Sequence, residues 1–463
     1  MPNQLSKIRV HTLAIAISGV LTSTTIFAKD TIYTAAPILT SVADHPQDAV
    51  FAQLRDAAAS NNAARAAQLA DQLSDYPLTS YVAYYRLKPQ LYNSDKTPNV
   101  NAPDAAIKQF LNTYSGDALG DRMRNDYALV LGARQDWRGF REQYSQFVLK
   151  DDMQLKCYEL MANAADGQNV VNAAMILLTE SKHANAKACQ QLIGSLAQKG
   201  QLKDEQRNYF TALAAYGSGA QGQALAGGGS AARMASLISQ ANNDTGSLAG
   251  AVSNSGLSGQ QSALANAYYG YSAARRAGSE AAGFYRNAYQ QYANLKLPDD
   301  VLGWQARAGM RVNDWTLVAS AIDKMNEGEK NTPIWQYWRG RAYAAQNDKS
   351  RATEQYNLAA KAFDFYGILA REALGQAVTL PVEAAAPTDI EVKAARNIAG
   401  FERARKFQAL NMTLEYNREW NFPLRGMNDR QLLAAAEYAR RIGFLDRMIN
   451  TSERTKSEFN FRQ

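Results

Sequence analysis

Histidine, cysteine, proline and long apolar runs are all scarce in this chain. The 463 residues include only 3 His, 2 Cys and 12 Pro, with 30 Gly. Such low Gly and Pro contents exclude a collagen-like protein or a low-complexity linker, and the 46% of apolar residues excludes wholesale disorder. The formal net charge is +7 and evenly spread, which is too mild to indicate a nucleic-acid partner. The length is sufficient for about three domains of ordinary size.

The N-terminus has the pattern of a secretory signal peptide. Lys7 and Arg9 precede a short apolar run, and Ala28 ends a stretch suited to signal peptidase. The alternative is a membrane anchor, but Ser, Gly and Thr interrupt the run before it reaches the roughly 18 to 20 residues that a spanning helix needs. We therefore expect cleavage after residue 28, a periplasmic protein, and no later membrane span.

The two cysteines are informative because an exported chain meets an oxidising compartment. Cys157 and Cys189 are 32 residues apart, a spacing that fits neighbouring turns of a helical repeat, so we expect them to form a disulfide. The alternative is a pair of buried thiols. We expect no metal and no cofactor, since only His45 and His183 remain after cleavage and His183 lies in a polar run typical of a solvated helix end.

Apolar residues recur with helical spacing along nearly the whole chain. Ile334, Tyr337, Trp338, Ala342 and Ala345 predict one helix stripe, and a second stripe follows. Five residues recur at an offset of 34, the period of tetratricopeptide-like repeats; the pairs are Trp304/Trp338, Arg307/Arg341, Ala308/Ala342, Asn313/Asn347 and Asp314/Asp348. The repeats predict a solenoid of helix hairpins in which each hairpin covers the apolar face of its neighbour.

Two further patterns favour packing over ligand binding. The glycines of 217–222 satisfy a dinucleotide fingerprint, but no strand precedes them, so we interpret them with Gly227 to Gly229 as a connection between helices. The tyrosines of 268–292 suit packing between helices, with sugar stacking as the alternative. Leu380-Pro381 and Ala386-Pro387 bracket a small-residue run that predicts a linker before more helices.

Several motifs in order along the chain resemble the soluble lytic murein transglycosylases. The early ones are Tyr76 to Tyr85, Phe110 to Tyr114 and Asp136 to Tyr144; Cys157-Tyr158 with Ala188-Cys189 resemble the paired cysteines of that family. The later ones are Ile334-Trp335 to Ala342, Phe363 to Gly367, Glu419-Trp420 and Ala436 to Gly443. The match spans most of residues 50 to 455.

The resemblance implies an all-α fold: a right-handed, U-shaped α-superhelix followed by a small helical L domain. We expect a signal peptide at 1–28, the superhelical domain at 29–380, a linker at 381–388 and the L domain at 389–463. The family continues into a lysozyme-like catalytic domain that cleaves the bond between N-acetylmuramic acid and N-acetylglucosamine without adding water. Its catalytic Glu-Ser pair and Gly-Leu-Met-Gln stretch have no equivalent here, and we assign no catalytic residue. Glu180-Ser181 is the one comparable dipeptide, and we interpret it as a solvated helix end.

The expected function is therefore the noncatalytic superhelical portion of a periplasmic lytic murein transglycosylase, inactive alone. Its expected partners are peptidoglycan glycan strands and other cell-wall enzymes. The alternative is a periplasmic solenoid scaffold that binds peptidoglycan or partner enzymes. An independent enzyme with an unrecognised site has the least support, because acid and base motifs are unpaired.

Overall fold

A computed structural model describes residues 44–180, 187–241, 249–257 and 259–460. This part of the chain is all-α, and its only β features are two isolated bridges. The expected leader peptide lies outside these residues. None of the helices in the described ranges has the length and apolar content needed to cross a bilayer.

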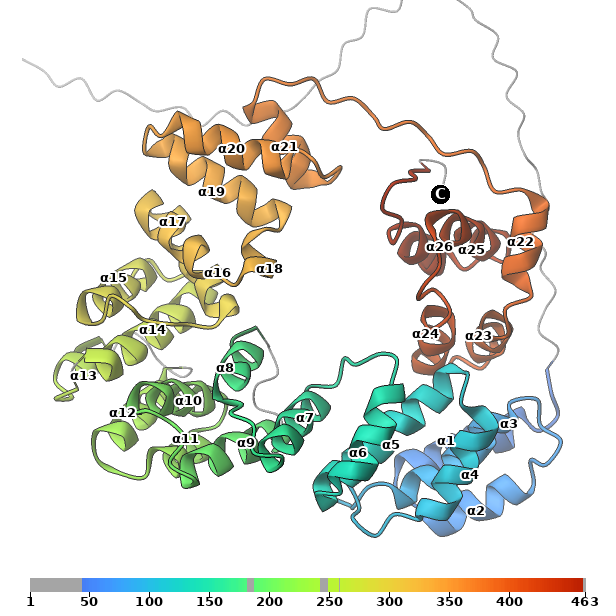
Figure 1. Ribbon diagram of the computed structural model, residues 1–463. Helices are drawn as coiled ribbons and strands as arrows, with labels where there is room; N and C mark the ends of the chain where they lie inside the picture. The colour runs from blue at the N-terminus through green and yellow to red at the C-terminus, as the bar shows by residue number, and fades with distance from the viewer. Residues whose placement is uncertain (1–43, 181–186, 242–248, 258, 461–463) are drawn as a thin grey trace, which may run out of the picture.

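The helices follow one another around a ring (Figure 1). The first arc contains α1 (Asp48–Ala59), α2 (Ala63–Asp71), α3 (Thr79–Leu87), the 3-10 helix η1 (Lys88–Gln90), α4 (Asp104–Tyr114), α5 (Ala118–Arg134) and α6 (Trp137–Gln146). The second contains α7 (Met153–Ala165), α8 (Val171–Glu180), α9 (Lys187–Gln198), α10 (Asp204–Gly217), α11 (Gly219–Ala226), α12 (Gly229–Gln240) and α13 (Ala249–Ser253).

The ring continues through a third arc and ends in a separate group of helices. The third arc contains α14 (Gly259–Arg275), α15 (Ala281–Gln291), α16 (Asp299–Arg311), α17 (Trp315–Lys324), α18 (Glu327–Lys330), α19 (Pro333–Ala345), α20 (Lys349–Ala359) and α21 (Phe365–Ala373). The last group contains α22 (Asp389–Arg396), α23 (Ala399–Ala409), α24 (Thr413–Asn421), α25 (Asp429–Arg441) and α26 (Leu445–Ser452).

The 34-residue repeat corresponds to the helix hairpins α16–α17 and α19–α20. Asn313 and Asn347 occupy the same place in the turn, both with positive φ (56° and 62°). Asp314 and Asp348 then cap the next helix, each accepting a hydrogen bond from the backbone N–H three residues on. Asn tolerates the left-handed conformation and Asp is a favoured N-cap, so the repeated pair sets the hairpin turn.

Close approach within a hairpin explains why small residues recur in it. A Cβ at Gly340 on α19 would lie 2.6 Å from the Tyr356 ring on α20, which leaves no room for a side chain. Ala342 is fully buried beside it, as the repeat predicts, but Ala345 is exposed. The buried surface of α19 instead includes Trp335, because this helix packs against neighbours on more than one side.

The hydrophobic core consists of two clusters, and one of them combines residues from both ends of the described chain. One cluster contains buried residues from Phe51 to Phe210 together with residues from Val392 to Ile442. The other contains residues from Ala212 to Ala370. The helices α22–α26 therefore share a core with the first helices of the chain, from which more than 300 residues of sequence separate most of them.

An extended segment joins α21 to α22, as the two proline pairs predict. Residues 374–388 contain no helix, and Leu380 and Val382 are largely exposed. In Figure 1 this segment crosses the gap between α21 and α22. A parallel bridge joins Glu383 to Phe459, and the Phe459 ring lies 5.8 Å from that of Phe363. The C-terminal segment thus contacts both the linker and the end of the third arc.

Candidate functional site

The ring closes where α3 meets α24, through hydrogen bonds from tyrosines to buried carboxylates. The Tyr81 hydroxyl donates to Glu419 Oε1 and the Tyr85 hydroxyl donates to Glu415 Oε1, each over 2.8 Å. Glu419 also accepts from Arg403 Nε at 2.7 Å. A buried carboxylate requires such partners, because an unpaired charge there would be strongly unfavourable.

Aromatic packing lies beside these polar contacts. The Phe407 ring on α23 is fully buried, 4.4 Å from the Tyr81 ring and 6.3 Å from that of Phe51 on α1. Lys406 next to it donates to Asp48 Oδ2 at 2.7 Å. The junction therefore combines a dry aromatic core with charged hydrogen bonds, an arrangement expected of a fixed interface.

A second carboxylate lies deeper in the first arc. Asp126 on α5 accepts from the hydroxyls of Tyr84 and Tyr92, both at 2.7 Å, and forms an ion pair with Arg122 Nη2 at 2.7 Å. Lys88 lies near the same group, and burial lowers the pKa of its ammonium. This network holds Arg122 in place on the surface that faces α24.

A cleft of about 450 Å³, here called the junction cleft, opens between α5, the loop before α7, and α24. Its first wall includes Arg122 and Asn125 on α5 and the adjacent acids Asp151 and Asp152. Both carboxylate oxygens of Asp152 accept hydrogen bonds within the fold. Oδ1 accepts from the backbone N–H of Gln154 at the start of α7, and Oδ2 accepts from Asn125 Nδ2. The volume is within the range of small-molecule sites, about 300–1,000 Å³.

The opposite wall of the junction cleft comes from α24 and the residues after it. It includes Asn417, Arg418 and Arg425. Within the part of the chain that the structure describes, neither arginine forms an ion pair with a carboxylate. Arg425 instead donates to the carbonyl of Asn421 and lies over the Phe422 ring. The α24 wall is therefore basic, whereas the loop before α7 is acidic; the charge of Arg122 on α5 is offset by its ion pair with Asp126.

Burial changes the acidity of the junction carboxyl Glu419. Desolvation raises its pKa above the usual range, even though Arg403 and the Tyr81 hydroxyl favour the charged form. A raised carboxyl pKa is a common sign of a catalytic acid. Glu419, however, has no exposed surface and uses its oxygens on Tyr81 and Arg403, so its geometry is that of a structural contact.

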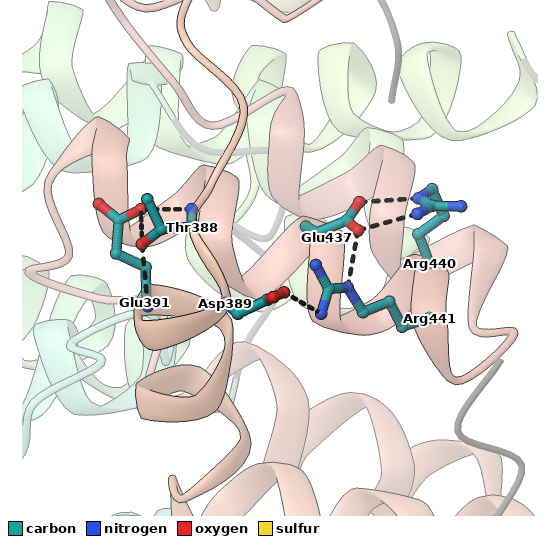
Figure 2. A network of polar contacts seen from close by, with 6 residues as sticks. All are labelled: Thr388, Asp389, Glu391, Glu437, Arg440 and Arg441. Carbon is teal, nitrogen blue, oxygen red and sulfur yellow. Dashed lines mark hydrogen bonds and ion pairs between the residues drawn. The ribbon is translucent and has the colours of Figure 1, made fainter. Parts of the chain in front are cut away.

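A separate polar network fixes the start of α22 against α25 (Figure 2). Thr388 and Glu391 form a capping box, and the Glu391 carboxylate also binds Arg430. Glu437 accepts from both Arg440 and Arg441 over 2.7–2.8 Å, as Figure 2 shows. These bonds are satisfied within the fold, which indicates a role in anchoring the linker.

The residues singled out from the sequence are dispersed. A disulfide joins Cys157 to Cys189, with their Cα atoms 5.0 Å apart, and it links α7 to α9. Glu180 ends α8, whereas Ser181 and His183 lie outside the described residues. His45 lies beside the Tyr76 ring at the start of α1. Among the described residues, no group of three or more His, Cys, Asp or Glu could hold a metal ion.

Sequence reasoning did not find the junction cleft. The tyrosines of α3 were part of a recognised motif, as was Glu419, but nothing in the sequence indicated that the two meet. Arg418 and Arg425 carry no local signal, because arginine on a helical surface is most often solvated. Only the closure of the ring brings α24 to α5.

The helices of the last group match a known domain. Residues 394–457 match the family model described as soluble lytic murein transglycosylase L domain. This segment is thus similar to the L domain of that family, and α22–α26, which contain most of it, are called the L domain below. The resemblance that the motifs indicate is thereby confirmed, and the L domain is the part of the chain that closes the ring. Among curated proteins, none matches the chain in sequence.

Solved structures similar to this chain include lytic transglycosylases. An inactive mutant of lytic transglycosylase Slt from Pseudomonas aeruginosa has a TM-score of 0.47 and 21% identity, and the alignment covers 87% of this chain and 70% of that chain. The 70-kDa soluble lytic transglycosylase from Escherichia coli has a TM-score of 0.43 and 16% identity, with 88% and 70% covered. A complex of the 70-kDa soluble lytic transglycosylase with bulgecin A gives the same values.

Proposed function

We propose that the described helices are the noncatalytic superhelical portion of a periplasmic lytic murein transglycosylase. The family reaction cleaves the bond between N-acetylmuramic acid and N-acetylglucosamine without water and yields 1,6-anhydro-muropeptides. The L domain shares one hydrophobic cluster with the first helices of the superhelix, and this single observation carries the proposal. A ring closed by an L domain holds glycan strands and presents them to catalytic chemistry.

The carboxyl groups at the junction support a noncatalytic role for these helices. A catalytic acid must reach the glycosidic oxygen within hydrogen-bond distance. Glu415 and Glu419 are buried and bound to tyrosine hydroxyls, and Asp126 is bound to two tyrosines and an arginine. We assign none of them to catalysis.

Digestion of purified sacculi tests this proposal. The protein should sediment with sacculi, and the binding should weaken as salt rises, because the net charge of +7 falls only to +5 when Lys7 and Arg9 are removed and still attracts the carboxylates of stem peptides. Chromatography of the supernatant should reveal no anhydro-muropeptides. Release of anhydro products by this chain, retained in Glu180→Gln, would show that an acid within the described helices performs the chemistry.

We further propose export and cleavage after Ala28. The disulfide between Cys157 and Cys189 supports this proposal, because such bonds persist in oxidising compartments such as the periplasm. Mass spectrometry of the protein from a periplasmic extract should give a mature N-terminus at Lys29. An intact Met1 form in the membrane fraction would contradict it.

The domain division is also a proposal. We place the superhelical domain at 29–380, the linker at 381–388 and the L domain at 389–463. The helix-free stretch between Ala373 and Asp389 supports these boundaries. Limited proteolysis should cut first in this stretch, and a first cut inside α19 or α25 would contradict the division.

A further inference from the structure

The junction cleft has charges of opposite sign on facing walls. Asp151 is exposed on the acidic wall and forms no ion pair within the part of the chain that the structure describes. Arg418 and Arg425 form the basic wall. A cleft lined in this way favours a ligand that carries both charges, because a simple anion or cation would meet repulsion from one wall.

Polar atoms in the same cleft lack partners. Asn125 is only 4% exposed, and its Oδ1 has no hydrogen-bond partner. Its Nδ2 donates to Asp152, so the amide orientation is set and Oδ1 is an acceptor. Asn417 Oδ1 and Arg122 Nε are likewise buried without a partner. Such atoms are rare in folded proteins, since each one costs free energy when unsatisfied.

We propose that the junction cleft binds a short peptide as a zwitterion, with both its carboxylate and its ammonium group free. The free carboxylate lies between Arg418 and Arg425, and the ammonium group lies toward Asp151. Asn125 and Asn417, whose Oδ1 atoms lack partners, line the same cleft and offer acceptors for the peptide N–H once the ligand displaces the side chains that cover them. This arrangement pairs the basic wall and the acidic wall with one ligand class and gives a donor to one of the two unpartnered acceptors.

The position of the junction cleft also couples ligand binding to closure of the ring. One wall belongs to α5 and the loop before α7, and the other belongs to the L domain. A ligand that bridges the two walls stabilises the closed ring by mass action.

Isothermal titration with three small probes tests the chemistry. Alanyl-alanine carries both charges, N-acetyl-alanyl-alanine lacks the ammonium group, and alanyl-alanine amide lacks the carboxylate. We expect saturable binding of alanyl-alanine and at least about tenfold weaker binding of each derivative, since each lost charge removes a charge-assisted hydrogen bond. Equal binding of acetate, or of either derivative, would overturn the assignment, as would no binding of alanyl-alanine up to about 10 mM.

Substitutions at two exposed residues of the cleft locate the site. Arg425→Gln should weaken alanyl-alanine binding about tenfold, and Asp151→Asn should weaken it while leaving the affinity for N-acetyl-alanyl-alanine unchanged. Arg65→Gln and Asp75→Asn, which remove exposed charges on and just after α2, are matched controls that should bind normally. Circular dichroism would verify that all four variants are folded.

These results separate the site from the proposed function. Sacculus binding that persists in Arg425→Gln while alanyl-alanine binding falls would support a peptide site distinct from the glycan contact. Unchanged alanyl-alanine binding in both cleft variants would overturn the site and leave the proposed function intact. Failure of wild-type protein to sediment with sacculi would instead contradict the proposed function alone.

Discussion

Replacing Phe407 with alanine should open the ring locally. Phe407 is fully buried on α23, with its ring 4.4 Å from that of Tyr81 on α3. Truncating a buried Phe to Ala costs about 3–5 kcal/mol, from lost burial and from the cavity left behind. Because Phe407 lies at the contact between the L domain and the first arc, this loss weakens their docking rather than the hairpins of the third arc.

Hydrogen–deuterium exchange measures this effect segment by segment. A loss of about 3 kcal/mol corresponds to roughly a 100-fold change in an equilibrium constant. Amides of α3, α23 and α24 should therefore exchange about 100-fold faster in Phe407→Ala if they open through undocking. Amides of α16–α20 belong to the other hydrophobic cluster and should keep the wild-type rate.

A matched variant in the second cluster provides the control. Phe284 on α15 is 6% exposed and lies 5.8 Å from the Tyr269 ring. Phe284→Ala should accelerate exchange in α14 and α15 and leave α23 and α24 unchanged. Faster exchange throughout the chain in both variants would refute the view that the two clusters are separate units joined at the junction.

Three other perturbations have defined outcomes. Replacing Cys157 and Cys189 with serine should lower the free energy of unfolding by about 4 kcal/mol, which is the chain-entropy value for a loop of this length. Denaturant titration with and without reductant would measure this loss, and an unchanged unfolding midpoint would contradict the prediction. Asp348→Ala removes the N-cap of α20 and should lower the free energy of unfolding, measured by thermal denaturation, by about 1 kcal/mol. Asp348→Asn keeps a capping side chain and should lower it less. Backbone N–H groups of 456–458 lower the pKa of Asp429 to about 2, so its stabilisation is complete above pH 3.8 and is lost as the pH falls through about 2. Proteolysis of the C-terminal segment by pepsin should accelerate over that interval, and Asp429→Asn should remove the pH dependence.

Much of the local structure could be predicted because its causes are local. The offset of 34 residues identified two hairpins, and the Asn-Asp pair in each turn has a conformational reason that acts within a few residues. The break at the two proline pairs has a similar origin. Burial was harder to predict: Ala345 fits the helical period but is exposed, because the neighbouring hairpins decide which sides of α19 are covered.

The helical repeats, the hairpin turns, the linker and the resemblance to a murein-cleaving family can all be predicted from the order of the amino acids, since each depends on residues close together in the chain. That the L domain packs on α1–α5 and shares their core is visible only in the folded molecule. The contacts that do so join Tyr81 to Glu419 and Lys406 to Asp48, across 338 and 358 residues. No local pattern specifies such pairs, because the curvature that brings them together accumulates over every intervening hairpin. The junction cleft, whose walls come from both ends of the ring, therefore exists only in the folded chain.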